Sequence, residues 1–150
     1  MTRRGWTIAV DGPAASGKTT LARRLAVELG YDFLDTGLLY RGVAQELHTR
    51  GQSTTDRAAA TAAALGLDTT TLDERQLATE EVGRGASEVA VIPAVREALL
   101  SLQRRIAATP HGAILAGRDI GTVVCPDAPV KLFVTASVEE RARRRYEQLR

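Results

Sequence analysis

A stretch near the N-terminus combines two glycines, a lysine and hydroxyl side chains at a spacing suited to phosphate chemistry. It matches the P-loop pattern G-x-x-x-x-G-K-[ST]. Its backbone N–H groups would converge on polyphosphate oxygens, and the dipole of the following helix adds positive potential there. Lys18 would reach the β- and γ-phosphates, and the Thr19 hydroxyl would ligate Mg²⁺. The residues of the loop are Gly12, Pro13, Ala14, Ala15, Ser16, Gly17, Lys18, Thr19 and Thr20.

The same glycines would also suit a tight turn that merely enters a helix. That interpretation leaves the Lys18-Thr19 pair unexplained, so the sequence favours a polyphosphate site.

Further polar residues follow apolar runs that predict strands. Thr36 and Arg41 come after the run 31–35, and Arg118 with Asp119 comes after the run 113–116. The carboxyl ends of parallel strands line one crevice, so these side chains are expected near the P-loop. Arg41 by itself is more typical of a solvated helix surface, and only its place after a strand makes it a candidate.

The elements that must position these residues follow from apolar periodicity and caps. Strands are predicted at 8–10, 31–35, 113–116 and 130–134, in an α/β arrangement with a parallel sheet. Leu21, Leu25 and Leu29 predict one helix stripe, ending at Gly30. Further helices are expected after Asp56, after Thr79, from Pro93 and after Ser137.

The helix from Pro93 is expected to bury Val95, Leu99, Leu102 and Ile106. Arg96 lies on the flank of that stripe, where it can either reach a cleft or rest its stem on the core.

The last predicted helix carries a run of arginines. Glu139 with Arg143, and Glu140 with Arg144, are spaced i, i+4 and are typical of helix surface. Arg141 and Arg145 have no acidic residue four positions upstream, which makes them the candidates for phosphate contacts.

Composition excludes several classes of protein. The 150 residues are 44% apolar and carry a net charge of +2, which predicts one globular domain and does not favour nucleic acid or a membrane surface as partner. Cys125 is the only cysteine, so no disulfide can form within the chain. No run reaches transmembrane length, and a cytoplasmic monomer is expected.

These motifs together resemble the bacterial cytidylate kinases, which are P-loop kinases of nucleoside monophosphates. The resemblance spans nearly the whole chain. It rests on Asp11-Gly12-Pro13 running into Ser16-Gly17-Lys18, on Asp35-Thr36-Gly37 with Tyr40-Arg41, on Ala86-Ser87 with Val95-Arg96-Glu97-Ala98-Leu99, and on Gly117-Arg118-Asp119-Ile120-Gly121-Thr122.

The resemblance implies a three-layer P-loop NTPase fold over residues 1–150, with a short helical monophosphate-binding insert at about 42–92. It implies transfer of the γ-phosphoryl of ATP to CMP or dCMP with Mg²⁺, with Lys18, Arg41 and Arg118 as catalytic residues. ATP would lie over residues 12–20, with Arg141 and Arg145 beside it. CMP would be held by Thr36, Gly37, Tyr40, Arg41, Ser87, Arg96, Gly117, Arg118 and Asp119.

The chain departs from the family pattern in three places. Ala116 stands where relatives carry an acidic residue, which bears on how Mg²⁺ is organised. The insert is short, and the lid, last strand and last helix expected after the arginine-rich helix do not follow Arg150, which predicts a truncated chain. Two alternatives therefore stay open: a small-molecule P-loop kinase of the shikimate or gluconate type, and a nucleotide-binding chain without turnover.

Overall fold

The structure is a computed structural model of the chain and describes residues 5–150. The chain divides into two compact units. Among the described residues, the first joins residues 5–36 to residues 103–150, and the second is the continuous segment Gly37–Leu102.

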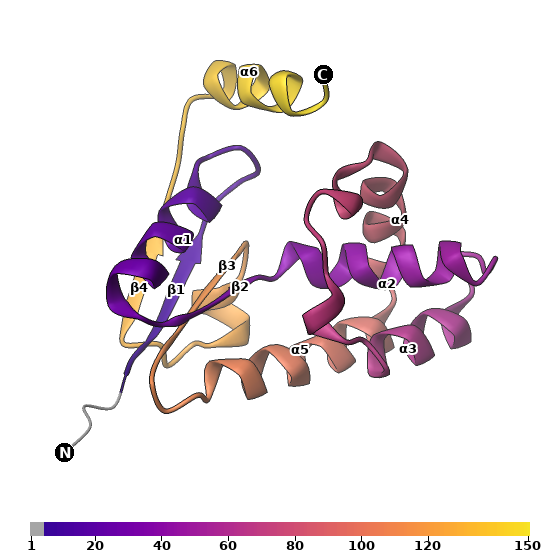
Figure 1. The fold of residues 1–150 in the computed structure, drawn as a ribbon, viewed down its shortest axis with the longest axis horizontal. Coiled ribbons are helices and arrows are strands. Elements are labelled where there is room, and N and C mark those ends of the chain that lie inside the picture. The colour runs from indigo at the N-terminus through magenta and orange to yellow at the C-terminus, as the bar shows by residue number, and fades with distance from the viewer. Residues whose placement is uncertain (1–4) are drawn as a thin grey trace. The chain divides into compact units, whose positions relative to one another are not determined.

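A four-stranded sheet forms the centre of the first unit (Figure 1). Its strands β1 (Thr7–Asp11), β2 (Asp32–Asp35), β3 (Ala113–Gly117) and β4 (Val130–Phe133) lie in the order β2-β3-β1-β4. All three strand pairs are parallel, which confirms the predicted parallel α/β sheet. The register places Asp11 opposite Gly117 and Asp35 opposite Ala116, so the carboxyl ends of β1, β2 and β3 lie along one edge of the sheet.

Burial along the strands follows their place in the sheet. All five residues of β3 are buried, as expected for an interior strand covered on both faces. In β4 burial alternates, and Phe133 is 73% exposed. This partial exposure of β4 follows from its position, because it has a partner strand on one side only within the described sheet.

Helix α1 (Lys18–Leu29) packs on one face of the sheet and ends at Gly30, as predicted. Its buried residues are Ala22 and Ala26, which pack with Ile8, Val10, Ile114 and Ala116. The expected Leu21, Leu25, Leu29 stripe is wrong, since Leu21 and Leu29 are exposed and only Leu25 packs against this core. Small alanine side chains let the helix backbone lie close to the sheet. Leu21 and Leu29 then lie outside this helix–sheet contact.

The first unit also contains a single π-helical turn, η3 (Ile120–Val124), after β3, and helix α6 (Val138–Gln148) after β4. The Ser137 hydroxyl accepts a hydrogen bond from the Glu140 N–H at 3.1 Å, which confirms the predicted cap of α6.

The second unit is helical and overlaps the range 42–92 that was predicted as an insert. Its elements are α2 (Gly37–Thr49), α3 (Arg57–Leu65), the short 3₁₀ turns η1 (Thr69–Thr71) and η2 (Gln76–Ala78), α4 (Glu80–Ala90) and the first part of α5 (Pro93–Ala107). Asp56 and Thr79 cap α3 and α4 through their side chains, as predicted. Val95 and Leu99 are fully buried in α5, whereas Leu102 and Ile106 are half-buried.

No helix among residues 5–150 combines the length and the apolar character that crossing a bilayer requires.

Candidate functional site

The loop between β1 and α1 is shaped by close backbone approach and by left-handed residues. A side chain at Gly12 would place its Cβ 2.1 Å from the Val134 carbonyl oxygen, so only glycine fits there. Gly17 has a φ of 93° at the start of α1, and Ala15 has a φ of 59°. The Ser16 hydroxyl is buried without a hydrogen-bond partner in the structure. An unpartnered buried hydroxyl is expected where a polar ligand supplies the partner.

Lys18 links this loop to the neighbouring strand ends. Its ammonium donates a hydrogen bond to the Pro13 carbonyl oxygen at 3.3 Å. Partial burial lowers the pKa of Lys18 below its ordinary value; the negative charge of Asp35 opposes this effect, and the positive charge of Arg118 adds to it. The cation therefore lies in the electrostatic field of Asp35, the last residue of β2, and of Arg118, the first residue after β3.

Asp11 is a site residue that the motif search did not assign. Its buried carboxylate accepts N–H groups from Ile120 and Gly121, each at 2.8 Å, and so fixes the start of η3. Its backbone oxygen accepts the Val134 N–H at 2.7 Å. The rule about strand ends could have identified Asp11, because it is the last residue of β1.

Thr36 and Gly117 meet where β2 and β3 end. The Thr36 hydroxyl donates to the Ala116 carbonyl at 2.9 Å, and its backbone N–H donates to the same oxygen at 2.9 Å. A Cβ on Gly117 would lie 2.5 Å from the Thr36 hydroxyl, so glycine keeps these two residues close. The side chain of Arg118 is exposed and that of Asp119 is partly exposed, which leaves both accessible to a ligand.

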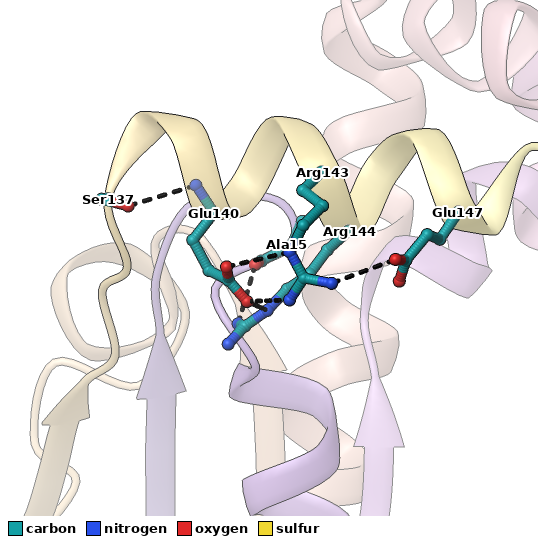
Figure 2. Close-up of polar contacts among 6 residues, drawn as sticks. All are labelled: Ala15, Ser137, Glu140, Arg143, Arg144 and Glu147. Atoms are coloured by element: carbon teal, nitrogen blue, oxygen red, sulfur yellow. Dashed lines mark hydrogen bonds and ion pairs between the residues drawn. The ribbon is translucent and has the colours of Figure 1, made fainter.

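On α6 the structure corrects the prediction about the arginines. Arg144, which the i, i+4 pattern placed on the helix surface, donates to the Ala15 carbonyl oxygen of the P-loop at 3.1 Å (Figure 2). Its predicted partner Glu140 is confirmed at 2.9 Å. Arg143 bonds Glu140 and Glu147 instead of the expected Glu139. Hydrogen bonds from Arg143 and Arg144 lower the pKa of the Glu140 carboxyl, which is therefore charged at neutral pH.

The two arginines that were predicted to contact phosphate lie on the same helix. Arg145 is exposed, and Arg141 is partly buried with an Nε that has no hydrogen-bond partner. That Arg141 and Arg145 contact phosphate stays a prediction, and the hydrogen bond to the loop comes from Arg144.

A cavity of about 960 Å³ lies beside the P-loop. This volume is in the range of small-molecule sites. Its lining includes Ala15, Ser16, Gly17, Thr20 and Arg144.

Two further predicted residues, Arg41 and Ser87, lie on helices α2 and α4 of the second unit. Arg41 donates to the Leu77 carbonyl at 2.7 Å, and its guanidinium lies against Gly83, where a Cβ would be 3.1 Å from Nη2. Ser87, one turn further along α4, donates to the Gly83 carbonyl at 3.3 Å. Gly83 is therefore a contact residue that the sequence did not single out, because nothing in its neighbourhood marks a turn.

Three other predicted residues also lie in the second unit. Gly37 is exposed at the start of α2, and Tyr40 is partly buried in its first turn. Arg96 is exposed on α5.

A parallel sheet whose first strand runs through a G-x-x-x-x-G-K-T loop into a helix defines a P-loop nucleotide-binding protein. The family model for cytidylate kinase matches residues 8–150. The chain belongs to the cytidylate kinase family, and so to the nucleoside monophosphate kinases.

Curated relatives agree with this assignment. The chain is 61% identical over 142 residues to a cytidylate kinase of Methylobacterium sp. (strain 4-46), covering 95% of this chain and 68% of the relative. It is 59% identical over 145 residues to that of Paramagnetospirillum magneticum, covering 95% and 69%, and 56% identical over 142 residues to that of Brucella suis biovar 1, covering 95% and 65%. The chain thus spans about two thirds of the length of these relatives.

Among solved structures, TT1252 from Thermus thermophilus matches 94% of this chain and 71% of its own, with a TM-score of 0.45 and 24% identity.

Proposed function

We propose that the protein transfers the γ-phosphoryl group of ATP to CMP or dCMP, giving ADP and CDP or dCDP. The observation that carries this proposal is the position of Lys18. Its ammonium lies in the P-loop and interacts electrostatically with Asp35, the last residue of β2, and with Arg118, the first residue after β3. The loop that would hold a triphosphate is therefore coupled to Arg118, which the family resemblance assigns to the monophosphate.

The P-loop would bind ATP mainly through its backbone. The N–H groups at the start of α1 face the phosphates, and Lys18 neutralises the charge that develops during transfer. Arg141 and Arg145 on α6 would add positive charge to the triphosphate.

The loop also fits Mg²⁺. That ion binds through one or two protein oxygens together with substrate phosphates, and it would neutralise charge on the β- and γ-oxygens. Thr19 supplies a hydroxyl at the second position of α1, and Asp11 and Asp35 place carboxylates in the same field around Lys18. Among residues 5–150 no group of three or more His, Cys, Asp or Glu side chains forms a separate metal site.

The monophosphate would be recognised by side chains. Arg41 on α2 would clamp its phosphate bidentately, with Ser87 and Arg96 as further contacts and Gly37 and Tyr40 at the start of the same helix as Arg41. Arg118 and Asp119 offer a donor and an acceptor for the amino group and ring acceptor of cytosine, beside Thr36 and Gly117. No general base is required, since positioning and charge neutralisation supply most of the rate of phosphoryl transfer.

A coupled assay of ADP release tests the proposal with CMP, dCMP, UMP, AMP and shikimate as acceptors. CMP or dCMP should give the highest kcat/KM. Preference for shikimate would indicate another class of P-loop kinase. Binding of ATP and CMP that raises Tm without any ADP release would show a nucleotide-binding chain without turnover.

A further inference from the structure

Arg144 connects helix α6 to one carbonyl of the P-loop. Its Nη1 donates to the Ala15 carbonyl oxygen at 3.1 Å, and its Nε donates to Glu140 at 2.9 Å (Figure 2). A guanidinium is planar and presents its donors in a rigid fork, so a bond on each side fixes its orientation. The Ser137 hydroxyl accepts a hydrogen bond from the Glu140 N–H and so caps the start of the helix that carries both residues.

The carbonyl that Arg144 holds belongs to a residue in an uncommon conformation. Ala15 has a φ of 59°, and a left-handed conformation costs a residue with a Cβ about 1–2 kcal/mol. A residue in this state needs outside contacts to keep it there. The described hydrogen bond to the Ala15 oxygen comes from Arg144.

One peptide group carries both the Ala15 carbonyl and the Ser16 N–H. In a trans peptide these two groups point in opposite directions. A cation on the carbonyl side therefore leaves the Ser16 N–H directed into the loop, where it donates to the Pro13 carbonyl oxygen at 3.3 Å. A hydrogen bond to the carbonyl also polarises the peptide and strengthens its N–H as a donor.

We propose that Arg144 is a positioning residue that holds the Ala15–Ser16 peptide with its N–H turned toward the phosphates of the nucleotide. This inference rests on the proposed function, because it assigns Arg144 a task in binding the phosphoryl donor. Arg144 acts through the loop backbone. Glu140 assists by keeping the guanidinium in place.

The alternative is that Arg144 binds the γ-phosphate directly. A direct contact would favour ATP over ADP, whereas a turned Ser16 N–H serves the phosphates that both nucleotides share. The two interpretations therefore predict different effects of losing Arg144 on the affinity for ADP.

The experiment compares R144M, R144K and R143M with the wild-type chain. Calorimetry measures the Kd of Mg-ATP and of Mg-ADP, and amide exchange by NMR follows Ser16 in the nucleotide-free protein. R143M is the matched control, because it removes the same charge from the same helix at a residue whose bonds go to Glu140 and Glu147. Melting temperature identifies any variant that fails to fold.

We expect R144M to weaken ATP and ADP alike, by about five- to twentyfold, since a hydrogen bond from a charged group is lost. Exchange of the Ser16 amide should become several-fold faster, and Tm should change little because both side chains are near the surface. R144K should recover only part of the affinity, and R143M should bind within about twofold of the wild type. The KM for CMP should be unaffected in all three variants.

Three outcomes would overturn the inference: weaker ATP binding with unchanged ADP binding, an R143M defect as large as that of R144M, or full recovery by R144K. If the wild-type chain binds no nucleotide, the proposed function fails. The Ser16 amide then still tests the inference, because faster exchange in R144M supports it and unchanged exchange contradicts it.

Discussion

The P-loop of the first unit and the α2–α4 contact of the second, both of which we propose to bind phosphate, differ in the groups that they present. The loop presents backbone N–H groups, and its shape depends on where a Cβ would collide, as at Gly12. The α2–α4 contact presents a side chain, with the Arg41 guanidinium of α2 lying against Gly83 of α4. The first depends on conformation, so it leaves a sequence motif. The second depends on packing between helices, so it becomes visible only in the structure.

The largest effect is expected when Lys18 of the P-loop is replaced. We expect K18M to lower kcat by about a hundredfold or more, because the charge that neutralises the transferred phosphoryl group is lost. A steady-state assay with saturating ATP and CMP measures this. Near-normal turnover would contradict the role given to the P-loop.

For K18M we expect no loss of stability, in contrast to its large loss of activity. Burial lowers the pKa of Lys18, so the folded protein holds its proton less tightly than the unfolded chain does. Stability should therefore rise with pH between the lowered pKa and the ordinary value for lysine. K18M removes this cost, and its Tm at neutral pH should be no lower than that of the wild type.

The next largest effect is expected at Arg41, in the α2–α4 contact of the second unit. R41M should raise the KM for CMP by about ten- to a hundredfold, since charged hydrogen bonds to the monophosphate are lost, while the KM for ATP stays within about twofold. Equal increases in the KM values for ATP and CMP would contradict the assignment of ATP to the P-loop and of CMP to the second unit.

Asp11 tests whether the strand ends need a rigid connection. In the wild type, the two carboxylate oxygens of Asp11 each accept one N–H group, from Ile120 and from Gly121. In D11N only one side-chain oxygen remains for these two N–H groups. The free energy of unfolding should fall by about 1–3 kcal/mol, as expected for an unpaired buried donor. Chemical denaturation measures this, and an unchanged midpoint would contradict it.

The smallest effect is expected for a substitution at Gly83, which contacts the Arg41 guanidinium. In G83A a Cβ would lie 3.1 Å from Nη2 of Arg41, so the guanidinium must shift slightly. The KM for CMP should rise a few-fold, and stability should increase by about 0.5–1 kcal/mol because alanine favours the helix. An unchanged KM would show that Arg41 reaches the monophosphate without contacting α4 in this way.

The sequence predicted the parts of the molecule that depend on local chemistry. The P-loop, the Gly30 end of α1 and the caps at Asp56, Thr79 and Ser137 each follow from a residue type at a defined place, and all are present in the structure.

Contacts between distant segments could not be predicted in the same way. The pairing of Arg144 with Ala15 joins residues 129 positions apart, and local spacing directed attention to Glu140 alone. The buried face of α1 was misjudged for a related reason. Periodicity ranks leucine above alanine, but closeness to the sheet selected Ala22 and Ala26.

The strand order also has a consequence for the order of folding. β1 pairs with β3 in a register that joins Thr7 to Ala113, so the first strand to be synthesised must wait for about 100 further residues. At about 5–20 residues per second this wait lasts about 5–20 s on the ribosome. The continuous helical segment Gly37–Leu102 has its contacts within itself and can form earlier. The glycine loop, although near the N-terminus, would then be among the last parts of the chain to reach its final shape.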